Sequence, residues 1–256
     1  MKISFVIPAY NEEERVGACI DSIQKELQNT GLRNPYFSAE IIVVNNASTD
    51  RTKEVALGRS SDGQLMRVID EPKKGLVMAR QAGFDASTGE LVANIDADVL
   101  LPAGWLSTVM RAFERDQQLV CLSGPFIYYD ISRFSRAMVK VFYFFAFILY
   151  FITRFILHIG SMVQGGNFVI KRSAMLQVGG YDTSISFYGE DTDVARRMNK
   201  VGKVRWTFAL PVYTSGRRFK GEGIITTSAR YTVNYFWVTF FGRPFTNVYK
   251  DIRPSR

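Results

Sequence analysis

Short apolar runs alternate with amphipathic stretches through the first hundred residues. Four runs rich in branched apolar residues predict strands: Ile3–Ile7, Glu40–Val44, Arg67–Ile69 and Leu91–Ile95. Between them, apolar residues recur at the spacing of one helix face, as in Leu76–Phe84 and at Val16, Ile20, Ile23 and Leu27. Repeated strand–helix–strand units predict an α/β fold with a mostly parallel sheet and helices on both faces.

Polar residues mark where two of these helices should begin. Asn11 is placed to cap the first helix, and Glu14 follows three residues later, which is the pattern of a capping box. Ser48-Thr49-Asp50 is a typical helix start after the second strand. We therefore expect the first helix to begin directly after Asn11.

The second half of the chain is less regular. Strands are predicted at Leu119–Leu122 and Phe168–Ile170, and a helix at Asp191–Val201 that ends at Gly202. No linker rich in Ser, Gly or Pro interrupts the chain. We expect one α/β domain over residues 1–215, with a hydrophobic insertion at 134–160 and a basic, aromatic, membrane-proximal extension at 216–256.

The hydrophobic insertion contains Val141–Ile152, an unbroken run of twelve apolar or aromatic residues. A spanning helix needs ~20 mainly apolar residues, so this run is short for one. Basic residues flank it, as expected beside anionic lipid, and an aromatic stretch follows at residues 231–241. We expect an aromatic helical segment that associates with the cytoplasmic face of the cell membrane, peripherally or as a re-entrant hairpin; ordinary core packing is the alternative. His158 is expected to pack or to lie at the interface rather than to bind a ligand.

Charge and cysteine content narrow the classes of partner. Lys and Arg number 32 against 24 Asp and Glu, a net charge of +8 over 256 residues, which favours anionic partners. The basic residues form no stripe with interleaved readout elements, so nucleic acid is not an expected partner. Cys19 and Cys121 lie far apart and form no disulfide framework, as in a reduced, intracellular chain. The apolar run between Lys2 and Pro8 is too short for the core of a secretory signal.

Polar clusters follow each of the first four predicted strands. They are Pro8–Glu12, Asn45–Ser48, Glu71–Gly75 and Asp96–Asp98. Ligands of open parallel sheets bind beyond the carboxyl ends of the strands, so these clusters predict a binding site along one rim. Each cluster alone is also explained by ordinary turn and capping chemistry.

Asp96-Ala97-Asp98 carries the most chemistry of the four. Alternate residues at a strand end point the same way, so both carboxylates can face one point. Two carboxylates beside a phosphate-bearing ligand suit Mg²⁺ or Mn²⁺. Neither G-x-G-x-x-G nor G-x-x-x-x-G-K-[ST] occurs, so a glycine cradle for phosphates is not supported.

Two glycine-containing elements and a basic cluster lie further along the chain. Gly165-Gly166-Asn167 precedes a strand, and Gly189-Glu190-Asp191 opens a helix, where an acid can simply favour the helix dipole. The basic cluster at 217–220 is a candidate for holding a departing diphosphate.

Together these residues resemble a family 2 glycosyltransferase of the GT-A fold, an inverting class. The matching motifs occur in the family's order: Val6–Glu12, Ser48–Asp50, Lys74–Gly75 through Arg80, Asp96–Asp98, Gly166–Asn167 and Gly189–Asp191. The resemblance implies a nucleotide-sugar donor, with Asp98 as metal ligand and Asp96 near the ribose, diphosphate and metal. It implies that the rest of the nucleotide is held by Pro8, Tyr10, Asn11, Glu12, Asn45, Ser48, Lys74 and Arg80.

The same resemblance implies the roles of the acids at 190 and 191. Asp191 would be the base that deprotonates an acceptor hydroxyl, with Glu190 as its alternate, and the sugar would be inverted. Where Asn45 stands the family usually has an acid, so the base of the nucleotide stays open. The Q-x-x-R-W element of processive synthases is missing, which favours transfer of one sugar per encounter.

Several alternatives remain at this point. The acceptor is a saccharide or a lipid-linked molecule at a membrane surface; if it were a polyprenyl phosphate, no base would be needed. A nucleotidyltransferase would also use paired Asp and metal, but it should carry a Gly-rich loop after the first strand, and Ala9–Glu12 has none. A non-catalytic membrane-binding module would leave the acidic pairs unexplained.

Overall fold

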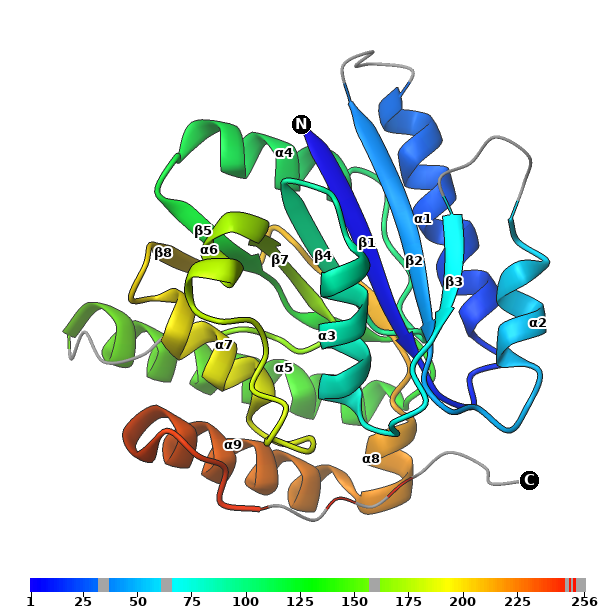
Figure 1. Cartoon of the computed structure of the whole chain (residues 1–256). Coiled ribbons are helices and arrows are strands. Elements are labelled where there is room, and N and C mark those ends of the chain that lie inside the picture. The colour runs from blue at the N-terminus through cyan, green and yellow to red at the C-terminus, as the bar shows by residue number, and fades with distance from the viewer. Residues whose placement is uncertain (32–36, 61–65, 157–161, 247–248, 250, 252–256) are drawn as a thin grey trace.

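A mixed sheet carries the fold, as the computed structural model shows (Figure 1). The structure describes residues 1–31, 37–60, 66–156, 162–246, 249 and 251. Within them the sheet has seven strands in the order β3-β2-β1-β4-β7-β5-β8. Their bounds are β1 Lys2–Ala9, β2 Ser38–Asn45, β3 Met66–Asp70, β4 Leu91–Ile95, β5 Leu119–Ser123, β7 Asn167–Lys171 and β8 Lys203–Trp206.

Helices cover both faces of this sheet (Figure 1). On one face lie α1 (Val16–Gly31), α2 (Thr52–Leu57) and α4 (Trp105–Arg115), whose apolar residues share a core with β1 and β4. On the other face α3 (Leu76–Ala86), α6 (Arg172–Gln177) and α7 (Glu190–Met198) share a second core with β2, β5 and β7. The predicted α/β class, with a mostly parallel sheet between two helical layers, is therefore confirmed.

Two local features differ from the prediction. The strand β7 runs antiparallel to both of its neighbours, β4 and β5, so the otherwise parallel sheet is interrupted between these two strands. The helix α1 begins at Val16 and not after Asn11, so the predicted capping box is wrong. Asn11 instead has a positive φ of 50°, and its side-chain oxygen accepts a hydrogen bond from the backbone N–H of Thr49 at 2.9 Å. A partner 38 residues away thus outcompetes the local cap.

A smaller unit packs beneath the carboxyl ends of the strands. It contains the parallel pair β6 (Phe126–Tyr128) and β9 (Val212–Thr214), the long helix α5 (Arg133–Phe151) with the π-helical turn Ile152–Ile156, and α8 (Arg217–Glu222) and α9 (Ile224–Phe241). In Figure 1, α5 and α9 run side by side along the bottom of the domain.

The long helix α5 lies along the domain. Arg133–Arg154 is long and apolar enough to cross a membrane by length and composition, and only 17% of its most apolar window is buried. Its middle residue Tyr143 stacks on Trp206. In the π-helical turn that follows α5, the hydroxyl of Thr153 lies 3.0 Å from the hydroxyl of Tyr235. The chain then returns to the central sheet at β7, so the segments before and after α5 lie in one domain. His158 and the rest of 157–160 lie outside the described residues.

Candidate active site

Two of the four polar clusters predicted from the sequence, Pro8–Glu12 and Asp96–Asp98, meet in a cleft at the carboxyl ends of β1 and β4. The cleft has a volume of about 130 Å³. Its acidic lining residues come from three separate segments of the chain: Glu12, Asp96 with Asp98, and Glu190 with Asp191. Basic side chains of α3 and α8 complete the polar lining, namely Arg80, Arg217 and Arg218. Acids nearly a hundred positions apart therefore share one cleft.

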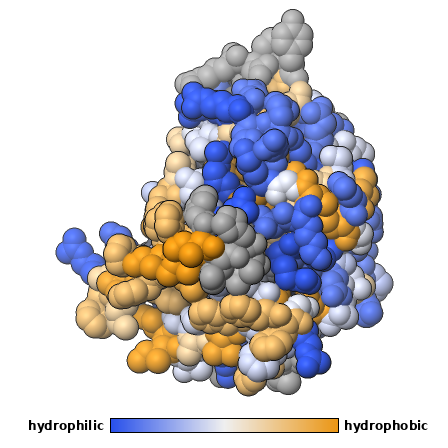
Figure 2. Space-filling model, turned by 90° about the vertical axis from the view of Figure 1, so that its left-hand side faces the viewer, coloured by the Kyte–Doolittle hydropathy of each residue, from blue (hydrophilic) through white to orange (hydrophobic). Residues whose placement is uncertain are grey.

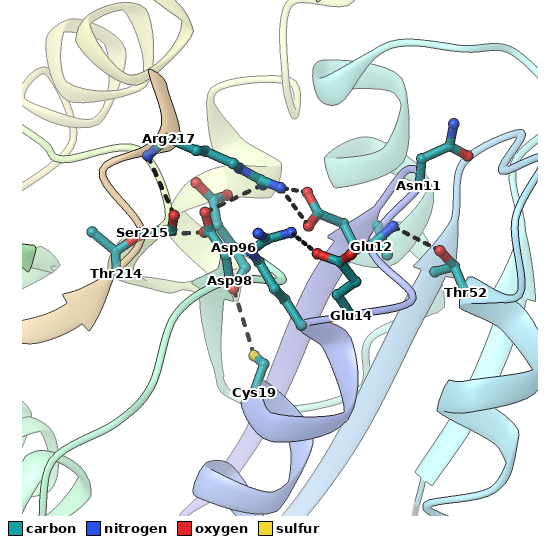
Figure 3. Close-up of polar contacts among 12 residues, drawn as sticks. Asn11, Glu12, Glu14, Cys19, Thr52, Asp96, Asp98, Thr214, Ser215 and Arg217 are labelled. Atoms are coloured by element: carbon teal, nitrogen blue, oxygen red, sulfur yellow. Dashed lines mark hydrogen bonds and ion pairs between the residues drawn. The ribbon is translucent and has the colours of Figure 1, made fainter. Parts of the chain in front are cut away.

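Asp98 lies at the centre of a charged contact between the sheet and α8 (Figure 3). The guanidinium of Arg217 is 3.2 Å from the carboxylate of Asp98 and makes a two-point ion pair with Glu12. The hydroxyl of Thr214 donates to Asp98 at 3.3 Å. Burial alone would lower the pKa of Arg217, but Glu12 and Asp98 raise it above its usual value, so the guanidinium stays charged.

Asp96 faces the cleft from the other side of Ala97. Its backbone N–H donates to the carbonyl of Gly166, and its carboxylate pairs with Arg80 at 3.0 Å. Gly166 has a φ of +83°, and a side chain there would collide with that of Asp96. The glycine predicted from the sequence thus permits the close approach of the β7 entry to Asp96.

Arg80 is fully buried and joins α3 to the start of α7. Its guanidinium pairs with Glu190 as well as with Asp96. Burial raises the pKa of Glu190 to about 7, although Arg80 acts in the opposite direction. One oxygen of Glu190, Oε2, has no hydrogen-bond partner among the described residues. The main contact of the Glu190 carboxylate is therefore its ion pair with Arg80.

Asp191 is held differently from its neighbour. The backbone N–H of Gly165 donates to one carboxylate oxygen at 3.1 Å, and that of Thr192 donates to the other at 2.7 Å. Burial raises the pKa of Asp191, while these two backbone hydrogen bonds oppose the rise. The backbone orients the carboxylate, which makes no ion pair within the part of the chain that the structure describes, and this arrangement leaves it able to accept a proton.

A second hollow lies on the far side of Pro8. It is lined by Pro8, Tyr10, Asn46, Lys74 and Leu76, among others, and by Phe187, which stacks on Tyr249. The ammonium of Lys74 lies 3.8 Å above the Tyr10 ring and 3.0 Å from Asp251. An aromatic ring beside a cation suits a flat heterocycle with a phosphate nearby.

Three residues that were predicted to bind the nucleotide do not line this hollow: Asn11, Asn45 and Ser48. Asn45 donates to Asp70 at 2.9 Å, and Ser48 accepts from the N–H of Asn11 at 3.2 Å. Asn46 lines the hollow instead, and its side-chain amide donates hydrogen bonds to the backbone carbonyls of Glu71 and Lys73. Asn45 ends β2, where successive side chains alternate in direction, and this alternation is the signal that could have favoured its neighbour.

Other lining residues were not chosen from the sequence. Gln164 and Tyr231 line the cleft, and Thr214 contacts Asp98 from β9. None of them belongs to a motif, and each reaches the cleft through long-range packing. Arg217 was predicted only as part of a basic cluster. In the structure its ion pairs with Glu12 and Asp98 hold it in the lining of the cleft.

The donor set suits a divalent metal that is held jointly with a substrate. Asp96 and Asp98 supply carboxylate oxygens, the ligands that Mg²⁺ and Mn²⁺ prefer. Among the described residues no group of three or more His, Cys, Asp or Glu surrounds a single point. Mg²⁺ is commonly bound by one or two carboxylates together with substrate phosphates, so a site with two acids fits that mode.

Comparison with known proteins identifies relatives by sequence. The profile of Glycosyl transferase family 2 matches residues 4–179. A dolichyl-phosphate beta-glucosyltransferase, ALG5C of Trichomonas vaginalis, is 40% identical over 96 residues, which are 37% of this chain and 28% of that protein. Its ALG5D counterpart is 35% identical over 143 residues, 54% of this chain and 44% of that protein. The chain spans less than half the length of these curated relatives.

Solved structures share the fold at low sequence identity. Glucosyl-3-phosphoglycerate synthase of Mycobacterium tuberculosis, in complex with Mn²⁺, UDP and glucosyl-3-phosphoglycerate, has a TM-score of 0.63 and 19% identity over 95% of this chain and 81% of that one. The mannosyltransferase PcManGT of Pyrobaculum calidifontis, with GDP-Man and Mn²⁺, has a TM-score of 0.58 and 18% identity over 88% and 62%. The fold is that of GT-A glycosyltransferases, and the chain belongs to glycosyl transferase family 2.

Proposed function

We propose that this glycosyltransferase moves a sugar from a nucleotide-diphosphate sugar to an acceptor hydroxyl at a membrane surface, with inversion of configuration. One observation carries the proposal: Asp98, which pairs with Arg217, and Asp191, which makes no ion pair with any described residue, line the same cleft. Sugar transfer needs both a cationic site for the leaving group and a base for the acceptor. Membership of family 2 favours sugar transfer over the nucleotidyltransferase alternative.

The donor would lie with its nucleoside in the hollow beside Tyr10 and Lys74 and its diphosphate over Asp96 and Asp98. Negative charge develops on the diphosphate as the bond to the anomeric carbon breaks. Arg80 and Arg217 are fixed cations beside that position. A divalent metal, Mg²⁺ or Mn²⁺, held by Asp98 and Asp96 would supply Lewis-acid stabilisation of the same charge. Mn²⁺ in both solved relatives supports this assignment.

Asp191 is the group assigned to the acceptor. Its carboxylate stays oriented by two backbone N–H groups while a hydroxyl proton is transferred to it. Glu190 remains the alternate base, but its ion pair with buried Arg80 makes a positioning role the better assignment. A base and a leaving-group site on opposite sides of one sugar lead to inversion.

The acceptor is proposed to be lipid-linked. In Figure 2 apolar residues gather over the lower part of the molecule, at the level of α5 and α9 in Figure 1, and polar residues dominate above. The exposed apolar residues of these helices include Phe134, Val141, Phe144, Phe145, Ile148, Phe151, Ile225, Phe236, Phe240 and Phe241. Basic residues such as Arg133 and Lys140 flank them, as in proteins that lie on anionic lipid. The dolichyl-phosphate relatives also support an acceptor at a membrane, and we assign the chain to the cytoplasmic face.

We expect the protein to sediment with vesicles that contain phosphatidylglycerol, and less with neutral vesicles or in high salt. Replacing both Phe144 (60% exposed) and Phe241 (63% exposed) with Ser should weaken binding by about tenfold or more, because two aromatic side chains would no longer enter the interface. Leu57→Ser on α2, 49% exposed, is the control. Equal vesicle binding by all three proteins would contradict the assignment of this face.

The reaction itself is tested with a panel of UDP-, GDP- and dTDP-sugars in the presence of Mn²⁺ or Mg²⁺. One donor is expected to give metal-dependent release of nucleoside diphosphate that increases when lipid-linked acceptors are added. The anomeric configuration of the product, read by NMR, should be opposite to that of the donor. A product with retained configuration would contradict the role of Asp191 as the base of a single displacement. Release of sugar 1-phosphate in place of nucleoside diphosphate would indicate nucleotidyl transfer.

A further inference from the structure

A second, larger cavity lies between α5 and α9. Its volume is about 320 Å³, within the roughly 300–1,000 Å³ range of small-molecule sites. The α5 wall consists of Val139, Phe142, Tyr143, Phe145, Ala146 and Leu149. The α9 wall consists of Ser228, Tyr231, Thr232, Asn234 and Tyr235. Both sets recur at three- and four-residue intervals, so each helix turns one continuous face toward the cavity.

This cavity continues into the active-site cleft. Residues that line both are Phe126, Tyr128, Gln164, Gly189, Asp191, Phe219 and Tyr231. At the junction, the hydroxyl of Tyr143 donates to Gln164 at 2.9 Å and accepts from the N–H of Phe126 at 3.0 Å, which fixes the wall. A molecule that fills the cavity therefore reaches Asp191 with one end.

The other end of the cavity lies among residues that face outward. Phe145, on its rim, is 62% exposed and belongs to the apolar surface of α5 described above. The α5 wall is mainly aromatic or aliphatic, α9 adds the polar side chains of Ser228, Thr232 and Asn234, and Gln164 and Asp191 lie where the cavity joins the cleft. An occupant that fits an apolar wall and also reaches Asp191 has an apolar chain and one polar, reactive head.

We propose that this cavity binds the apolar chain of the acceptor, a single-chain lipid whose reactive head lies beside Asp191. The inference rests on the proposed function and deepens it by naming the acceptor class and the place of its chain. The continuity with the cleft favours a substrate over a docked helix or a second copy of the protein, because neither would carry a reactive group to Asp191. A cavity volume of about 320 Å³ favours one chain over a two-chain glycerolipid.

The test is calorimetric titration of the full-length protein with farnesyl phosphate, farnesol and dimethylallyl phosphate, without a donor. Farnesyl phosphate should bind more tightly than dimethylallyl phosphate, which has the same head and a shorter chain. Ala146→Trp fills the cavity from α5 and should raise the Kd for farnesyl phosphate by about tenfold or more, because burial of the chain supplies the affinity. Ala137→Trp, on an exposed position of the same helix, should leave the Kd unchanged.

A second pair of variants tests the opposite wall. Ser228→Trp narrows the cavity from α9, and Ala229→Trp, on the exposed side, is its control. Binding of UDP and GDP is measured in parallel and should not change in any of the four variants. The titrations measure lipid binding without turnover, so they test the cavity independently of sugar transfer. A negative titration would leave the proposed sugar transfer intact, and a negative donor panel would leave the lipid site intact.

The two head groups separate the sources of affinity. Chain-dependent binding of both farnesol and farnesyl phosphate supports the site and leaves the acceptor group to be a hydroxyl or a phosphate. Chain-dependent binding of farnesyl phosphate alone supports the site and adds a phosphate contact near Arg218. Equal Kd values for long and short chains, or for Ala146→Trp, Ser228→Trp and the unmodified protein, would overturn the proposal.

Discussion

Replacing Asp191 with Asn is expected to lower kcat by roughly 10²–10⁴-fold, the usual contribution of a general base. Asn retains the shape of the side chain and an oxygen that can accept from Gly165 or Thr192, so the fold should persist. The amide cannot take the proton of the acceptor hydroxyl. Steady-state kinetics with circular dichroism and thermal melting separate a lost base from a lost fold.

The pH profile gives this prediction a second readout. Because burial raises the pKa of Asp191, activity of the unmodified enzyme should fall on the acid side at a higher pH than an exposed aspartate would allow. The Asn variant should lose this acid limb. Near-normal turnover of the variant would remove the base role and favour a phosphate acceptor, which needs no deprotonation.

Glu190→Gln is the matched comparison for Asp191→Asn. Gln keeps the side-chain length but removes the charge opposite buried Arg80. If Glu190 positions Arg80, the variant should affect donor KM more than the variant at 191 does, and it should retain the acid limb of Asp191. If Glu190→Gln lowered kcat more than Asp191→Asn does, Glu190 would be the base and Asp191 the positioning residue.

Asp98→Asn should reduce kcat on the order of 10²–10³-fold and weaken metal-dependent binding of the nucleoside diphosphate. The variant removes the carboxylate that faces Arg217, while Arg217 keeps its two-point ion pair with Glu12. The local structure should therefore survive. Titration of Mn²⁺ followed by electron paramagnetic resonance, with and without UDP or GDP, measures the loss directly.

The control for Asp98→Asn is a carboxylate at another strand end. Asp70 ends β3 and pairs with Asn45 and Lys53 outside the cleft. Asp70→Asn should leave Mn²⁺ binding and kcat nearly unchanged. Mn²⁺ binding that is equally strong in the Asp98 variant, or equally weak in both, would remove Asp98 as a specific metal ligand.

The central sheet was predictable because burial on both faces leaves a strong local signal. The strands β1, β2 and β4 are short runs of branched apolar residues, and their polar successors fall at one rim. The direction of β7 was not predictable, because pairing with β4 and β5 depends on how the chain returns after α5. Asn11 failed as a cap for a similar reason, since its partner Thr49 is distant in sequence.

The acids of the candidate site were predictable and much of its wall was not. Asp96, Asp98 and Asp191 stand at motifs, and the fold brings them to one cleft as the resemblance implied. Asn46 lines the hollow in place of Asn45 because successive side chains alternate in direction at the end of β2, and the sequence alone does not fix the residue at which that strand ends. The cavity between α5 and α9 arises from two amphipathic faces that meet only in the folded chain. The domain boundary at residue 215 stays a prediction.

The claim on which the mechanism depends is that one donor molecule contacts the metal-binding acids and the base at the same time. A crystal structure of the protein with Mn²⁺ and its nucleotide-sugar, in the Asp191→Asn form to slow turnover, measures this directly. We predict the metal on Asp98, the diphosphate between it and Arg80, and the anomeric carbon facing residue 191 across the cleft. A donor bound outside this cleft, or a sugar turned away from residue 191 with the diphosphate in place, would contradict the account.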